Sequence, residues 1–153
     1  QALTARGDAE VFVADTTGDG YGLVHRLDLN DRLAVDVPLA GLGSAVGDAD
    51  LVLLETDALG PDSAICSVGS LTAAAVAAQL GTEVWLVAGV GRCLPAAMWE
   101  PLRAMVVSDE PWEDRYEVVS LDLVDRVVGP GGPVPAAEAR FRIDCPVAPE
   151  LFR

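Results

Sequence analysis

One stretch of the sequence, residues 50–80, constrains the fold more than any other: DLVLLETDALGPDSAICSVGSLTAAAVAAQL. Four apolar residues at 51–54 form a short run that suits a strand buried on both faces of a parallel sheet. An Ala-rich segment at 71–80, followed by glycine, predicts a helix that lies close to the sheet. Apolar residues at 83–88 predict the next strand. The loop of this strand–loop–helix–strand unit is the place to expect a ligand site, at the carboxyl ends of the strands.

The rest of the chain continues the alternation of strands and helices. We predict strands at 9–15, 33–38, 116–124 and 141–143, and helices at 21–28, 42–47 and 95–105. Pro101 favours a break in the last helix. The alternation favours a parallel sheet with right-handed crossovers, and 153 residues fit one domain spanning 1–153. We therefore predict a three-layer, Rossmann-like α/β domain with a mostly parallel sheet.

Composition excludes several functional classes. No apolar run approaches the roughly 20 residues that cross a bilayer, and residues 1–6 lack a signal region, so we expect a cytoplasmic protein without membrane contact. A net charge of −14 repels phosphates and anionic lipids, so nucleic acid is not an expected partner. Cys66, Cys93 and Cys145 are scattered and only one histidine is present, so we expect reduced, buried thiols, no metal and no cofactor.

The acidity itself has two interpretations. All ten basic residues are Arg, and Lys is absent. One interpretation is adaptation to a high-salt cytoplasm, where screening removes most self-repulsion. The other is an acidic docking face for a basic partner. The spread of acidic residues along the whole chain favours the first, which predicts poor folding at low salt.

The central stretch also resembles the core of the initiation factor 2B-like family. In that family a strand ends in a Gly-Ala-Asp triplet, here Glu55-Thr56-Asp57, and a helix opens on Gly-Thr, here Gly69-Ser70. The segment 144–151, DCPVAPEL, resembles the closing Asp-…-Pro-x-Glu-Leu motif. The family includes the α, β and δ regulatory subunits of eukaryotic initiation factor 2B, methylthioribose-1-phosphate isomerase and ribose-1,5-bisphosphate isomerase. The resemblance runs from about residue 11 to 151 and matches only the C-terminal, Rossmann-like half of a typical member.

The resemblance implies a site around one carboxylate. Asp57 matches the Asp that acts on the sugar hydroxyls of the isomerases, and a carboxylate at this strand end is well placed for proton transfer. Its alternative role is to cap backbone N–H groups of the loop. Glu55 is a candidate second carboxylate. Arg92 is the candidate cation, either for a phosphate or for an ion pair with the acidic surface.

Other positions depart from the isomerases. Their Asn-Lys pair stands here as Cys66-Ser67, which cannot supply a cation, so a packed thiol competes with a ligand-binding role. Their Arg-Pro stands as residues 15–17, Asp-Thr-Thr, which replaces a positive charge with a negative one. Gly69 and Ser70 fit either an anion site at the start of the helix or plain N-capping by a serine.

Two functions follow from the resemblance. The first is a non-catalytic regulatory or scaffold domain that self-associates as a homodimer. The second is an aldose–ketose isomerase on a ribose phosphate, or a protein that binds a sugar phosphate or a nucleoside monophosphate, with Asp57, Glu55 and Arg92 as its site. The departures at the Asn-Lys and Arg-Pro positions favour the first. An unrelated flavodoxin-like domain is disfavoured because the chain has no phosphate-binding glycine pattern.

Overall fold

The computed structural model describes residues 9–16, 18, 20–30, 33–139 and 142–146. Residues 1–6, Thr17, Phe141 of the predicted edge strand and residues 147–151 of the closing motif lie outside these ranges. The elements in chain order are β1 (Val11–Ala14), α2 (Gly20–Asp28), β2 (Ala34–Val37), η1 (Leu39–Gly41), α3 (Leu42–Asp48), β3 (Leu51–Leu59), β4 (Ser63–Ser67), α4 (Ser70–Leu80), β5 (Glu83–Ala88), α5 (Ala96–Val106), β6 (Tyr116–Ser120), η2 (Leu121–Leu123), β7 (Arg126–Gly129), β8 (Gly132–Pro135) and α6 (Ala136–Ala139).

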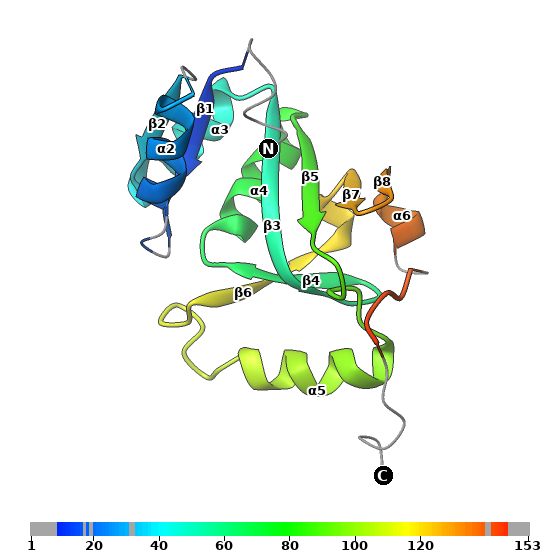
Figure 1. Ribbon diagram of the computed structural model, residues 1–153. Coiled ribbons are helices and arrows are strands. Elements are labelled where there is room, and N and C mark those ends of the chain that lie inside the picture. Colours follow the sequence, from blue (N-terminus) through cyan, green and yellow to red (C-terminus); the bar gives the residue numbers. More distant parts are fainter. Residues whose placement is uncertain (1–8, 17, 19, 31–32, 140–141, 147–153) are drawn as a thin grey trace.

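The strands form two separate sheets (Figure 1). The larger has the order β6-β4-β3-β5-β7-β8, and β1 and β2 pair in parallel as a sheet of their own. In the larger sheet β3, β5 and β7 are parallel, whereas the β3–β4, β4–β6 and β7–β8 pairs are antiparallel. The predicted α/β, Rossmann-like class is confirmed. Tight turns after β3 and β7 fold the chain back on itself, which makes the β3–β4 and β7–β8 pairs antiparallel.

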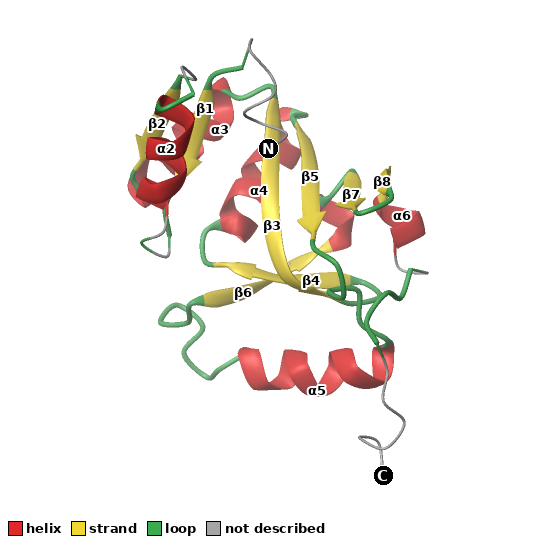
Figure 2. Cartoon of the chain, viewed as in Figure 1, coloured by secondary structure: helices red, strands yellow, loops and turns green. Residues whose placement is uncertain are grey.

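Helices lie on both faces of the larger sheet (Figure 2). On one face, α3 and α4 cover the parallel strands, and Leu42 and Val46 of α3 join Val52 and Leu54 of β3 in the main hydrophobic cluster. On the other face, α5 lies over β6 and the β3–β4 hairpin. The helix is held there by Trp99, which is fully buried in a second cluster with Ala58 and Ile65.

The prediction that residues 51–54 are buried on both faces is wrong. Val52 and Leu54 are buried, but Leu53 is 43% exposed, and Val87 on β5 is 38% exposed. The reason is the position of α5, which packs on the hairpin side of Ala58 and leaves the first half of β3 uncovered. We call this surface of β3 and β5, with Leu53, Trp85 and Val87, the outer face.

The Ala-rich helix forms where the sequence predicts it. Helix α4 buries Ala73, Ala74 and Ala77 against the sheet, and small side chains let it approach closely. It ends at Gly81, which has a left-handed backbone with φ of 76°. Thr82 donates its N–H to the carbonyl of Ala77, which completes the helix end.

Three predicted elements differ from the structure. Helix α5 continues through Pro101, because burial of Trp99 offsets the one backbone hydrogen bond that proline removes. The strand predicted at 116–124 stops at Ser120, whose hydroxyl accepts the N–H of Asp122 and starts the 3-10 turn η2. Strands β4, β7 and β8 were not predicted, and residues 142–143 are not in a strand. Within the described ranges, no helix is both long enough and apolar enough to span a membrane.

Candidate functional site

The candidate site lies where β3 changes partners. Its parallel pairing with β5 ends at Thr56, opposite Ala88, and its antiparallel pairing with β4 starts there. The register shifts between Thr56 and Ala58, so Asp57 is the extra residue of a β-bulge. Asp57 continues the alternation of exposed side chains at 53 and 55 along β3, and its side chain is 51% exposed.

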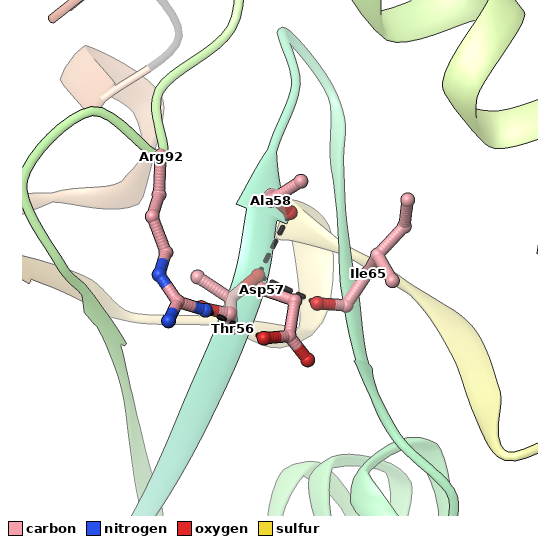
Figure 3. Close-up of polar contacts among 5 residues, drawn as sticks. All are labelled: Thr56, Asp57, Ala58, Ile65 and Arg92. Carbon is pink, nitrogen blue, oxygen red and sulfur yellow. Dashed lines mark hydrogen bonds and ion pairs between the residues drawn. The ribbon is translucent and has the colours of Figure 1, made fainter. Parts of the chain in front are cut away.

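Thr56 fixes the geometry of this bulge from inside (Figure 3). Its side chain is fully buried, and its hydroxyl is shared between the carbonyl of Ala58 at 2.8 Å and that of Ile65 at 2.7 Å. The hydroxyl therefore ties the irregular backbone of β3 to the neighbouring strand. Thr56, the middle residue of the triplet, therefore has a structural role.

Asp57 and Arg92 form an ion pair beside the bulge (Figure 3). The Nη1 atom of Arg92 lies 2.6 Å from Oδ1 of Asp57 and also donates to the carbonyl of Thr56 at 2.8 Å. Arg92 is held in place because its own carbonyl accepts the N–H of Leu59 at 2.8 Å. The guanidinium therefore bridges the loop after β5 to the end of β3. The sequence prediction that Arg92 meets the surface acids is confirmed for Asp57.

The Asp57–Arg92 pair is poorly suited to bind a ligand, because each side chain is already engaged with the other. Oδ1 of Asp57 already accepts a hydrogen bond from Arg92, and Arg92 is 35% exposed, so solvent screens the attraction. A sugar phosphate would have to compete with Asp57 for Arg92. Such a half-exposed pair is typical of a surface contact between two loops.

Glu55 does not join this pair. It lies on the outer face of β3, opposite Val87 in the register, and its side chain is exposed. Among the described residues, Glu55 makes no hydrogen bond or ion pair with Asp57 or Arg92. The two carboxylates of the triplet therefore do not form a paired acid–base site in this structure.

Cys66 and Ser67 also lie apart from the ion pair. Cys66 is fully buried opposite Thr56, and burial raises the pKa of its thiol to about 12. The nearby Glu117 and Asp57 carboxylates act in the same direction, more weakly than burial does. A thiol in this state is protonated at neutral pH and is a packing group. Ser67 is half-buried at the end of β4, opposite Tyr116.

The start of α4 is occupied by a side chain of the protein itself. Gly69 precedes the helix with φ of 94°, and no serine caps it through its side chain. Instead, the carboxylate of Glu117 on β6 accepts the N–H of Leu71. A carboxylate of the protein itself therefore lies at the helix start formed by Gly69 and Ser70. The sequence alone had allowed an external anion to bind at this position. Sequence reasoning missed Glu117, because nothing local marks a partner 46 residues away.

Two surface hollows lie elsewhere. The larger, of about 850 Å³, lies between α5, η2 and α6 and is lined by Asp62, Arg103 and Asp125 among others. The smaller, of about 370 Å³, is mainly apolar and lies beyond the carboxyl ends of β3 and β5, next to Cys93. There the Asp144 carboxylate adds to burial in raising the pKa of the Cys93 thiol to about 11. Neither hollow is lined by Asp57 or Arg92.

Comparison with known proteins shows likeness in structure alone. No family model matches the sequence, and no curated protein matches it. Initiation factor eIF2B beta from Chaetomium thermophilum superposes with a TM-score of 0.66 and 18% identity, over 85% of this chain and 40% of that chain. The eIF-2B structure from Pyrococcus horikoshii OT3 has a TM-score of 0.66 and 12% identity, over 82% of this chain and 49% of that chain.

A third solved structure is an assembly, the tetrameric eIF2B-beta2-delta2 complex from C. thermophilum. Its matching chain has a TM-score of 0.66 and 19% identity, over 86% of this chain and 44% of that chain. The present chain thus spans less than half the length of each of these neighbours. The resemblance noted in the sequence is confirmed in three dimensions: the chain has the fold shared by subunits of initiation factor 2B.

Proposed function

We propose that this chain is a cytoplasmic, non-catalytic regulatory or scaffold domain of the initiation factor 2B type, and that it acts by associating with a second copy of itself. The observation that carries the proposal is the uncovered outer face of the parallel strands. Parallel sheets are normally covered on both faces, so a face of β3 and β5 that no described helix covers favours a partner. A structural neighbour is a subunit of a tetrameric complex, which agrees with association through this fold.

The outer face has the make-up of an interaction surface. Trp85 lies opposite Leu53 on one side and opposite Arg126 on the other. Its ring is held by two contacts, a hydrogen bond from its Nε1 to Glu83 at 2.9 Å and the Arg126 guanidinium 5.9 Å above the ring. A tryptophan fixed in advance loses little entropy when a partner covers it, and apolar side chains within a charged rim are typical of binding hot spots.

The alternative, a sugar-phosphate isomerase or binding protein, has weaker support. Asp57 is engaged with Arg92, Glu55 is not part of that ion pair, and Cys66 is inaccessible in the core. The observation in its favour is the position of the Asp57–Arg92 pair at the carboxyl ends of parallel strands, where α/β sheets bind ligands.

Sedimentation of the full chain in about 2 M KCl tests the proposal, because high salt screens repulsion between two copies that each carry −14. We expect the mass of a dimer, and a monomer for Leu53→Glu. Leu80→Glu is the matched control, because Leu80 is 57% exposed but lies at the end of α4, away from the outer face. A monomer at every concentration of the unaltered chain would rule out self-association.

Thermal melts test the alternative with ribose 5-phosphate, ribose 1,5-bisphosphate and nucleoside monophosphates as probes. A ligand at a hundredfold excess over its Kd stabilises a folded protein by about 2.7 kcal/mol. We expect no shift with any of these compounds. A shift that disappears in Asp57→Asn would favour the isomerase or sensor function over the scaffold.

A further inference from the structure

Two of the three cysteines lie side by side, although they are far apart in the sequence. The N–H of Cys145 donates to the carbonyl of Cys93 at 3.2 Å, and the N–H of Asp144 donates to the same carbonyl at 3.3 Å. The Asp144 carboxylate in turn accepts the N–H of Cys93 at 2.9 Å. Figure 1 shows residues 142–146 running beside the loop that follows β5. Three hydrogen bonds therefore hold residues 144–145 against Cys93.

The backbone of Cys93 is fixed from the opposite side as well. Leu59 of β3 donates its N–H to the carbonyl of Arg92, and its own carbonyl accepts the N–H of Leu94, both at 2.8 Å. Residues 92–94 therefore run alongside the end of β3, and the N–H and C=O groups of Cys93 face residues 144–145. One side of the contact between the cysteines is thus anchored to the sheet.

The separation of the two cysteines suits a disulfide. A backbone hydrogen bond of this length places the two Cα atoms within about 6.5 Å of each other, given standard bond lengths and angles. A disulfide needs Cα atoms about 4.4–6.8 Å apart. Both cysteines are half-buried free thiols. The Sγ atom of Cys145 makes only a weak contact with the carbonyl of Pro146, at 3.6 Å, which a rotation about χ1 breaks.

We propose that Cys93 and Cys145 form a redox-sensitive pair, which a small disulfide such as oxidised glutathione links covalently. The thiolate of one cysteine attacks the oxidant, which gives a mixed disulfide and releases one glutathione, and the other cysteine then displaces the second glutathione. The pair loses two electrons and two protons, and one oxidised glutathione becomes two reduced molecules. Such a link suits a cytoplasmic protein, because redox-sensing disulfides form there only transiently.

The link would fix one wall of the smaller hollow. Cys93, Arg142 and Asp144 line this hollow together with the end of β3. A disulfide would tie residues 142–145 to the loop after β5, directly beyond Arg92, which pairs with Asp57. Oxidation would therefore make the wall of the hollow and the candidate site one covalent unit. This inference does not depend on self-association or on catalysis.

Equilibration of the reduced full chain in glutathione buffers at high salt tests the proposal. Burial and the Asp144 carboxylate raise the pKa of the Cys93 thiol to about 11, so a mildly alkaline pH is used to supply more of the attacking thiolate. Trypsin places the three cysteines on separate peptides, because it cleaves after Arg92, Arg103 and Arg142. We expect a linked pair of the Cys93 and Cys145 peptides. Its equilibrium constant should exceed that of the urea-unfolded chain by about tenfold or more, because the fold holds the two thiols together.

Serine variants locate the link. Cys93→Ser and Cys145→Ser should each abolish it, and oxidation should raise the melting temperature of the unaltered chain but of neither variant. Cys66 is the internal control in both variants, because it is fully buried opposite Thr56 and should stay reduced. Three results would each overturn the proposal: glutathione adducts in place of the link, a disulfide between two copies of the chain, or an equilibrium constant no greater than in the unfolded chain.

Discussion

The carboxylate of Glu117 on β6 accepts the backbone N–H of Leu71 in the first turn of α4. Helix starts leave N–H groups unsatisfied, and removing a side-chain cap costs about 1 kcal/mol. We therefore expect Glu117→Ala to lower the free energy of unfolding by about that amount, measured from urea denaturation midpoints at high salt. Glu113→Ala, in an exposed loop, is the control and should leave the midpoint unchanged. Equal effects of the two variants would contradict the capping role.

Gly60 has no room for a side chain. A Cβ atom there would lie 2.2–2.5 Å from the buried ring of Trp99. We expect Gly60→Ala to destabilise the domain by roughly 2 kcal/mol or more, because the ring has to move within a packed cluster. Gly43→Ala in α3 is the opposite case, since a Cβ there meets nothing within 4 Å. That variant should stabilise the helix by about 0.5–1 kcal/mol, and a chemical denaturation series on both variants distinguishes the two.

Burial holds the Cys66 thiol in its protonated form up to a pKa of about 12. Alkylation by iodoacetamide near pH 8 should therefore spare Cys66 in the folded chain and reach it only after unfolding, because the thiolate is the reactive species. The half-exposed Cys145 is the internal control for reagent activity. Modification of Cys66 at the rate of Cys145, located by peptide mass mapping, would show that the thiol is accessible.

The same thiol makes a contribution to stability that depends on pH. Its pKa is 9.0 in an exposed chain and about 12 when folded, so the folded state holds the proton more tightly. The contribution is complete below pH 9 and is lost as the pH rises toward about 12. We expect Cys66→Ala to remove part of the alkaline loss of stability seen in melts above pH 9, although the variant is less stable near pH 7. An identical alkaline slope in both proteins would contradict this.

Net charge predicts a strong response to salt. The chain carries −14, and the range of charge repulsion falls from about 10 Å at 0.1 M salt to about 3 Å at 1 M. The melting temperature should therefore rise with KCl over this range. Choline chloride at equal ionic strength is the control, because general screening predicts the same rise with either salt. A melting temperature independent of salt would contradict adaptation to high salt and favour an acidic docking face.

The sequence predicts local units well. The strand at 51–54, the Ala-rich α4 with its closing Gly81, and the strand β5 appear as expected, because each depends on composition within a few residues. The parts that it did not predict depend on distant contacts. Pro101 stays inside α5 because Trp99 anchors that helix from another layer. The division into two sheets depends on which edges meet, which no local pattern records.

In the candidate site, too, the local features were predicted and those that depend on distant contacts were not. The family resemblance located Asp57 and the neighbouring strand end, and the interpretation of Arg92 as a partner for surface acids is confirmed. The bulge at Asp57 was not predictable, because a register shift is a property of two strands together. The core position of Cys66 likewise follows from its place opposite Thr56 across the hairpin.

Strand β3 passes through both hydrophobic clusters of the molecule. Val52 and Leu54 lie in the main cluster with α3 and α4, and Ala58, four residues further along the same strand, lies in the cluster around Trp99. Both clusters are therefore built in part on the backbone of one strand. The two clusters should therefore melt in a single cooperative transition, and β3 is the element that makes the hairpin with α5 one folding unit with the parallel core.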